Sequence, residues 1–336
     1  MALQFILGPS GAGKSEYIYE DIIRRTMQDE RENVIVLVPE QYSLEIQRKL
    51  VQKHPRGGSF QIDVIGFNRL AYRIFDELHI KPKKVLEDFG KSMLLRKAAQ
   101  EHKEELSLYA GSLDKAGFID EAKSLMSEIY QYDIPRERLR EALQKLDDSE
   151  EARVLARKLQ DMLVIFDAFE EKKGQSFIVA EQMLELLTAA AEQSEMIAGS
   201  EIVLDGFTGF TPIQLNLISV LLRRAKKVTI VLTIDAATYE KKHVAEHELF
   251  ALTKQTIEHL LLTAEQAHVV VKPVLLLGKD GCKRWSKGHP LAHLEQNLFR
   301  YPYRVGKDEE QAITITAYDT PAQELTGVAE QIRTLV

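Results

Sequence analysis

The chain of 336 residues contains a single cysteine, Cys282, and no long apolar run. One cysteine excludes a disulfide within the chain and any metal site built from several cysteines. The longest apolar stretches, such as 34–38 and 274–277, have the length of strands and fall far short of the roughly 20 residues that cross a membrane. Residues 1–7 lack the basic segment and long apolar core of a signal peptide. We therefore expect a cytoplasmic protein with no membrane partner.

The chain also lacks an excess of positive charge. Lysine and arginine number 44 and aspartate and glutamate number 51, which gives a formal net charge of −7. Domains that bind nucleic acid through bulk electrostatics are usually basic. Any contact with DNA must therefore come from a local patch or from a partner chain.

Short apolar strands alternate with amphipathic helices at both ends of the chain, and the middle is helical. Apolar periodicity predicts strands at 3–7, 33–38, 60–65, 201–204, 228–234, 269–277 (interrupted by Pro273) and 313–317. It predicts helices at 15–27, 68–78, 212–224, 246–267 and 321–335, and in the middle at 88–101, 115–131, 135–146, 150–173 and 179–192. Between 82 and 198 no stretch has the pattern of a strand. We predict an α/β fold with a parallel sheet, helices on both faces and an all-helical insertion.

This alternation predicts the division into domains. Residues 1–80 and 199–310 form the α/β domain, residues 81–198 form the insertion, and residues 311–336 begin a following domain. The apolar-periodic stretch 328–336 contains no helix-end signal, so we expect the natural protein to continue beyond Val336.

One motif is specific. Residues 8–15 match G-x-x-x-x-G-K-[ST] at every required position and lie between a predicted strand and a predicted helix. Such a loop curls so that backbone N–H groups and the helix N-terminus face phosphates. Lys14 would bridge β- and γ-phosphate oxygens of ATP, and the Ser15 hydroxyl would ligate Mg²⁺. The predicted nucleotide-binding residues are Gly8, Pro9, Ser10, Gly11, Ala12, Gly13, Lys14 and Ser15.

A second metal ligand is expected at the end of another strand. Asp205 ends the predicted strand 201–204, where ligands collect in open α/β sheets. It is therefore the candidate partner of Ser15 for Mg²⁺, although an Asp-Gly pair also favours an ordinary turn. The next residue, Gly206, is not the acid that would activate water, and we assign no catalytic residue to this segment.

In this order the motifs resemble the first motor domain of superfamily 1 DNA helicases, a P-loop NTPase fold. More closely, the chain resembles the N-terminal part of the AddB family, the B subunits of bacterial ATP-dependent helicase–exonucleases. The runs that carry the resemblance over the whole chain are 5–15, Val-Pro-Glu-Gln-Tyr-Ser at 38–43, 66–71 and Asp-Gly-Phe-Thr-Gly-Phe-Thr-Pro-Ile-Gln at 205–214. Active helicases of this type carry Asp-Glu where this chain has Asp205-Gly206, and a glutamine where it reads 233–237.

The resemblance implies a role in processing DNA double-strand breaks for homologous recombination. It implies a helicase-like part with little motor activity of its own, an AddA-type helicase/nuclease partner in a heterodimer, single-stranded DNA as ligand and recognition of the Chi sequence. The family's nuclease domain and iron–sulfur cluster belong to a C-terminal region absent here. Residues at the matching strand ends would face the single strand, with Tyr42 stacking a base and Gln41 contacting the backbone, and with Phe67 and Arg69 beside them.

Other interpretations stay open. The loop around Trp285, with Lys279, Lys283, Arg284 and Lys287, suits either phosphate contact with stacking or a solvated loop. A small-molecule P-loop kinase with a helical lid would need arginines of the insertion to converge on phosphates. Those arginines lie on helical faces with no visible cluster: Arg96, Arg136, Arg138, Arg140, Arg153 and Arg157. A non-catalytic nucleotide-binding scaffold is the third class.

Overall fold

A computed structural model describes residues 1–29, 31–81, 83–115, 117–147, 149–174, 176–278, 283–286, 288–307, 309 and 311–336. Within them, a seven-stranded sheet has the order β3-β2-β6-β7-β1-β8, with β9 also paired to β1. Every pairing in it is parallel. The strands are β1 (Ala2–Gly8), β2 (Asn33–Leu37), β3 (Ile62–Ile65), β6 (Ser200–Leu204), β7 (Lys227–Thr233), β8 (Val270–Val271) and β9 (Leu275–Leu276). The predicted α/β fold with a parallel sheet is confirmed.

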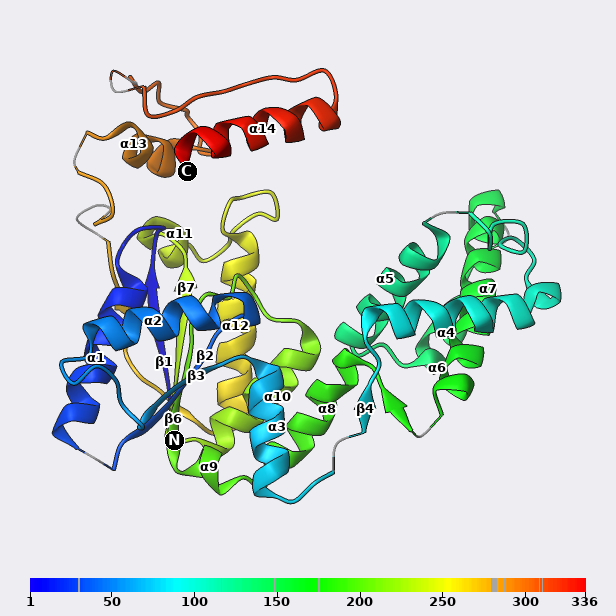
Figure 1. Ribbon diagram of the computed structural model, residues 1–336, viewed down its shortest axis with the longest axis horizontal. Coiled ribbons are helices and arrows are strands. Elements are labelled where there is room, and N and C mark those ends of the chain that lie inside the picture. The colour runs from blue at the N-terminus through cyan, green and yellow to red at the C-terminus, as the bar shows by residue number, and fades with distance from the viewer. Residues whose placement is uncertain are drawn as a thin grey trace.

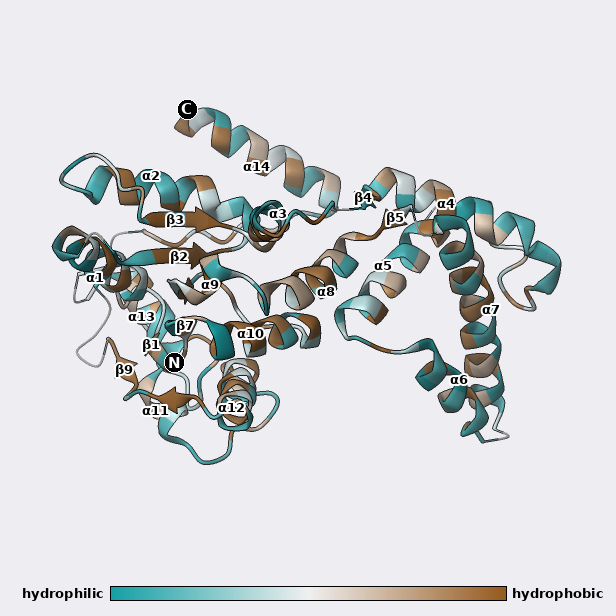
Figure 2. Cartoon of the chain, turned by 90° about the horizontal axis from the view of Figure 1, so that it is seen from below, coloured by the Kyte–Doolittle hydropathy of each residue, from teal (hydrophilic) through white to brown (hydrophobic). Residues whose placement is uncertain are grey.

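Helices cover both faces of the sheet because successive strand residues point to opposite sides. Ile6, Val36 and Val203 face α1 (Lys14–Gln28) and α2 (Ser43–Lys53) in one buried cluster. The neighbouring residues of the same strands face the opposite cluster. That cluster includes side chains of α3 (Phe67–Glu77), α8 (Ala180–Ala191), α9 (Glu195–Ala198), α10 (Pro212–Arg224) and α12 (Ala251–Gln266). Figure 2 shows the apolar strands in brown between these layers.

The helical insertion has a core of its own and lies to one side of the sheet (Figure 1). Its helices are α4 (Asp88–Glu101), α5 (Phe118–Gln131), α6 (Arg136–Gln144) and α7 (Glu150–Lys173), with the short 3-10 helix η2 (Lys103–Glu105). Phe169 and Leu95 are fully buried in this core. The prediction of no strand here is wrong, since β4 (Lys84–Val85) pairs with β5 (Phe177–Ile178). Two residues are too few to show a strand period in a sequence.

The packing of α8 and α9 bears on the predicted domain limits. Met183, Leu187 and Ile197 are buried in the core of the sheet, where α8 packs on α3 and α10. The prediction places residues 180–198 with the insertion instead. Val179 is buried in the core of the insertion and Ile178 in that of the sheet, so the two cores meet at this point of the chain. The domain division itself stays a prediction.

In the last third of the chain, two elements of the structure differ from the prediction. The strand expected at 313–317 does not form, and these residues are mostly exposed. The helix expected from 246 begins at 251, because the Glu248 side chain accepts the Ala245 N–H at 3.1 Å and holds a turn there. The interruption at Pro273 is confirmed between β8 and β9. The remaining elements are η1 (Glu40–Tyr42), α11 (Ala236–Glu240), α13 (Pro290–Asn297) and α14 (Pro321–Leu335).

None of the helices formed by the described residues combines the length and the apolar character needed to span a membrane.

Candidate functional site

The carboxyl ends of five parallel strands lie side by side. Gly8 is paired with Thr233, Leu37 with both Leu204 and Ile65, and Leu204 with Ile230. The loops that follow β1, β2, β3 and β6 therefore leave the sheet at one edge, although they are far apart in the sequence. These four loops carry the nucleotide-binding, metal-binding and DNA-binding residues that the sequence predicts.

The loop 8–15 forms a tight turn into α1. Ala12 donates its N–H to the Pro9 carbonyl at 3.3 Å, and Gly13 has a φ of 82°, which only glycine adopts without strain. Gly13 is also the residue that precedes the first turn of α1, so the helix N-terminus points out of this loop. The Lys14 ammonium donates to the carbonyls of Gly8 and Pro9 at 2.9 and 2.8 Å, which holds the cation over the turn. Such a turn presents N–H groups and positive charge to an anion.

A cleft of about 650 Å³ opens at this edge of the sheet. Among the residues that line it are Lys14, Ser15, Tyr19, Tyr42, Asp205 and Arg284. Lys14, Ser15 and Asp205, which the sequence predicts as phosphate and metal contacts, are thus brought together. No residue of the insertion is among the described lining residues. The Arg136 and Arg140 guanidiniums instead bond Asp167 at 2.7 and 2.6 Å, which removes the support for a kinase lid.

Asp205 has a partner that sequence analysis missed. The Tyr19 hydroxyl of α1 donates to Asp205 Oδ2 at 2.6 Å, and the Gly206 N–H donates to Oδ1 at 2.9 Å. The Asp205 side chain is buried, with 4% of the residue exposed. Burial raises the pKa of Tyr19, and the Asp205 carboxylate raises it further, so the hydroxyl keeps its proton and donates. Both carboxylate oxygens therefore hold a donor already.

The backbone at Gly206 explains why no acid stands there. Its φ is 81°, in the left-handed region, where a residue with a Cβ costs about 1–2 kcal/mol. A Cβ would lie 3.4 Å from the Pro39 side chain, an ordinary van der Waals contact, so the strain comes from the backbone conformation. A glutamate at this position would therefore be strained, whereas glycine adopts the turn freely.

The four predicted DNA contacts lie on two neighbouring loops of this edge. Gln41 and Tyr42 follow β2 in η1, and Tyr42 is 43% exposed. Phe67 and Arg69 begin α3, where Arg69 is exposed and Phe67 packs partly on the core. The Glu40 side chain joins the two loops by accepting the Asn68 N–H at 3.0 Å. Gln41, Tyr42 and Arg69 are thus available at the surface, whereas Phe67 is half-buried.

Sequence analysis missed two aromatic residues beside Phe67. The Phe67 ring lies 5.4 Å from that of Phe207, and the Phe207 ring lies 5.3 Å from that of Phe210. All three are half-buried, so each ring keeps part of its surface in solvent. The run Asp-Gly-Phe-Thr-Gly-Phe at 205–210 contained the signal, since it places two aromatics directly after the strand that ends at the site.

The loop after β9 returns to the nucleotide turn. Lys283 and Arg284 donate their backbone N–H groups to the Gly11 carbonyl at 3.0 and 3.2 Å. Both side chains are exposed at the cleft, and the Arg284 guanidinium lies 5.6 Å from the ring centre of Trp285. Lys279 and Lys287, for which the sequence leaves phosphate contact and a solvated loop both open, lie outside the described residues, as does Cys282.

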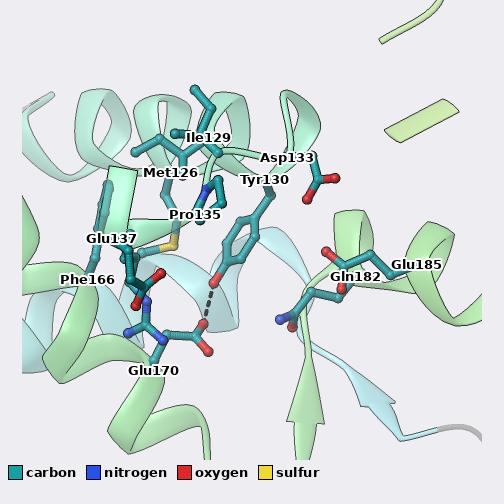
Figure 3. Close-up of a pocket in the computed structure, with 12 residues that line it drawn as sticks. Met126, Ile129, Tyr130, Asp133, Pro135, Glu137, Phe166, Glu170, Gln182 and Glu185 are labelled. Atoms are coloured by element: carbon teal, nitrogen blue, oxygen red, sulfur yellow. Dashed lines mark hydrogen bonds between the residues drawn. The ribbon is translucent and has the colours of Figure 1, made fainter. Parts of the chain in front are cut away.

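A second cavity of about 290 Å³ lies in the insertion, between α5, α6, α7 and α8 (Figure 3). In it the Tyr130 hydroxyl donates to the Glu170 carboxylate. Lys173, which is not among the lining residues, donates to Glu170 at 2.9 Å and to Gln182 at 2.8 Å. Burial, then repulsion by Asp133, raises the pKa of the Glu185 carboxyl. None of the residues that the sequence predicts to bind nucleotide, metal or single-stranded DNA lines this cavity, so the cleft at the sheet edge is the candidate site.

Comparison with known proteins identifies the relatives of this chain. Residues 5–295 match the family model described as ADDB, N-terminal. The chain is 38% identical to the B subunit of the ATP-dependent helicase/deoxyribonuclease of Lachnoclostridium phytofermentans, over all of this chain and 29% of that protein. It is 32% identical to the protein of the same name from Caldanaerobacter subterraneus (100% and 28%) and 31% identical to that from Clostridioides difficile (100% and 29%). The chain thus spans less than a third of the length of these relatives.

Proposed function

Because the chain belongs to the ADDB N-terminal family, we propose that it is the helicase-like part of the B subunit of an ATP-dependent helicase/deoxyribonuclease. The whole enzyme processes DNA double-strand breaks for homologous recombination. This part binds ATP and single-stranded DNA at neighbouring loops of one sheet edge. The observation that carries the proposal is the cleft in which Lys14 and Ser15 lie together with the loops after β2 and β6.

The nucleotide turn fits a triphosphate. The loop 8–15 follows a buried strand and precedes α1, with Gly13 in a conformation that brings its backbone close to a ligand. A Cβ at Gly13 would lie 3.2 Å from the Lys283 side chain, so only glycine leaves this space open. In the proposed complex the N–H groups of the turn and the Lys14 ammonium hold the β- and γ-phosphates.

The same cleft supports the proposal that this part has little motor activity of its own. ATP hydrolysis needs a group that orients or deprotonates water, and the position after Asp205 is a glycine in a left-handed conformation. The carboxylate that α2 contributes to the cleft, Glu45, is paired with Lys49. We therefore assign strand movement to an AddA-type partner chain and nucleotide binding to this part.

Single-stranded DNA is proposed to cross the exposed loops 39–43, 66–69 and 206–211. Exposed aromatic and basic side chains on such loops stack on bases and contact phosphates. Tyr42 and Arg69 are exposed here, and the rings of Phe207 and Phe210 continue the aromatic surface. The family resemblance implies that the helicase-like part takes part in recognition of the Chi sequence, and we propose that these loops serve that role.

Replacing Tyr42 with alanine should weaken binding of single-stranded DNA by about 5- to 150-fold, the effect of about 1–3 kcal/mol for one stacked base. The measurement is fluorescence polarisation of a labelled oligonucleotide, with and without a Chi sequence, titrated with the chain. Tyr132→Ala is the matched control, because Tyr132 is exposed on the insertion, away from the sheet edge. Equal affinity of wild type and Tyr42→Ala would remove DNA binding from this loop.

A further inference from the structure

Cations gather at the nucleotide turn, and Asp205 is one of three carboxylates among the described lining residues of the cleft, with Glu16 and Glu45. Lys14 lies over the turn, and the chain segment after β9 adds Lys283 and Arg284 through its two bonds to the Gly11 carbonyl. No carboxylate in the described part of the chain pairs with either Lys283 or Arg284. By contrast, Lys49, which also lines the cleft, is engaged by Glu45.

The Asp205 carboxylate does not suit direct ligation of a metal ion in this arrangement. Mg²⁺ demands near-octahedral geometry and keeps several of its waters, and a carboxylate that ligates it directly must offer an oxygen that the ion can reach. Asp205 is buried, its Oδ2 holds the Tyr19 hydroxyl at 2.6 Å and its Oδ1 holds the Gly206 N–H at 2.9 Å. An ion that ligated Oδ2 directly would compete with the Tyr19 hydroxyl, and Tyr19 is packed in the buried cluster between α1 and the sheet. The Asp205–Tyr19 bond instead ties α1 to β6.

We propose that the phosphates of a nucleotide in this cleft are neutralised by Lys14, Lys283 and Arg284, without a metal ion held by Asp205. The inference rests on the proposed nucleotide site and concerns how that site balances charge. Its ligand class is a nucleoside triphosphate bound with or without a divalent cation. Asp205 is a positioning residue, which holds the helix of the nucleotide turn against the strand that leads to the loop 206–211.

The charge of a triphosphate also favours binding by several cationic side chains. A triphosphate carries several negative charges, which P-loop proteins balance with a lysine and a metal ion. Arginine presents a planar fork of N–H donors that suits phosphate, and each charge-assisted contact is about twice as strong as a neutral one. Two additional cations at the rim can therefore take the place of one divalent ion.

The test is a titration of the 336-residue chain with a fluorescent ATP analogue, once in EDTA and once in Mg²⁺. The readout is the ratio of the dissociation constant in EDTA to that in Mg²⁺. Circular dichroism verifies that each variant is folded. The proposal predicts a wild-type ratio below about threefold. Arg284→Gln and Lys283→Gln should each weaken binding in EDTA by about tenfold. Arg48→Gln is the matched control, since Arg48 is exposed on α2 and does not line the cleft.

The variant Tyr19→Phe tests whether the Tyr19 hydroxyl keeps a metal ion from the Asp205 carboxylate. Removing the hydroxyl frees Asp205 Oδ2, so the Mg²⁺ ratio should rise by about tenfold relative to Tyr17→Phe, an exposed tyrosine of the same helix. A ratio that stays at the wild-type value in Tyr19→Phe overturns the role given to Tyr19. A wild-type ratio above about 30-fold that Asp205→Asn abolishes overturns the whole inference while leaving the nucleotide site in place. Absence of binding under both conditions overturns the proposed nucleotide site itself.

Discussion

Replacing Lys14 with alanine should weaken ATP binding by about 10- to 150-fold. The ammonium is the cation that the turn itself holds at its centre, through the carbonyls of Gly8 and Pro9. Loss of one charge-assisted contact to phosphate costs about 1.5–3 kcal/mol, which corresponds to that range of affinity. Isothermal titration calorimetry of ATP against the wild type and the variant measures the ratio directly.

The control for this variant is Lys97→Ala, because Lys97 is an exposed lysine of α4 in the insertion and makes only a long ion pair of 4.0 Å with Glu101. Its affinity for ATP should equal that of the wild type, which separates the local effect from loss of net charge. If Lys14→Ala bound ATP as tightly as Lys97→Ala, the nucleotide would be bound somewhere other than the turn.

The second large effect is a loss of stability, and it is expected in the insertion, at Asp161 of α7. Its carboxylate is 1% exposed and accepts the N–H groups of Ser107, Leu108 and Tyr109 at 2.8, 2.7 and 2.8 Å. Asp161→Asn keeps the shape but replaces one acceptor oxygen by an amide that donates, so buried N–H groups lose their partner. We expect the free energy of unfolding to fall by about 2–4 kcal/mol, measured by urea unfolding at about pH 7.

The stability that the Asp161 carboxylate contributes should decrease as the pH falls. Burial by itself would raise the pKa of Asp161, but the N–H groups of Tyr109, Ser107 and Leu108 outweigh it and hold the pKa below its ordinary value. A lowered pKa in the folded state gives stability that is complete above the unfolded pKa of about 3.9 and is lost as the pH falls through the folded pKa. The difference in stability between wild type and Asp161→Asn should therefore shrink below about pH 4.

Asp167→Asn on the same helix is the matched control for Asp161→Asn. Asp167 pairs with Arg136 and Arg140 at the surface, where 42% of its side chain is exposed. Exposed ion pairs contribute about 0–1 kcal/mol, so this variant should lose little stability at neutral pH. If the two variants lost equal stability, the bonds from the buried carboxylate to the loop 107–109 would not be what stabilises the insertion.

The fold and the nucleotide turn could be predicted because their signals are local. The motif at 8–15 is contiguous, and the strands at 33–37 and 227–233 are short runs rich in β-branched apolar residues, which favour buried strands. The position of Asp205 at the same edge follows from its place directly after a strand, since all these strands run in parallel.

Contacts between distant segments could not be predicted in the same way. The Tyr19–Asp205 bond joins residues 186 positions apart and depends on α1 lying across β6. Lys283 and Arg284 reach the turn only because β9 pairs with β1, so that the following loop leaves the sheet beside Gly11. The strand expected at 313–317 does not form for the converse reason, because a local apolar pattern does not decide whether a segment joins a sheet.

Hydrogen–deuterium exchange of the chain with and without saturating ATP tests the central claim most directly, because it locates the ligand without assuming activity. Backbone N–H groups that hold phosphate are protected from exchange. The account predicts ATP-dependent protection of peptides that cover residues 9–16, with a smaller effect at 205–208 and none in the cavity of the insertion. Protection confined to other parts of the chain, with 9–16 unchanged, would contradict it.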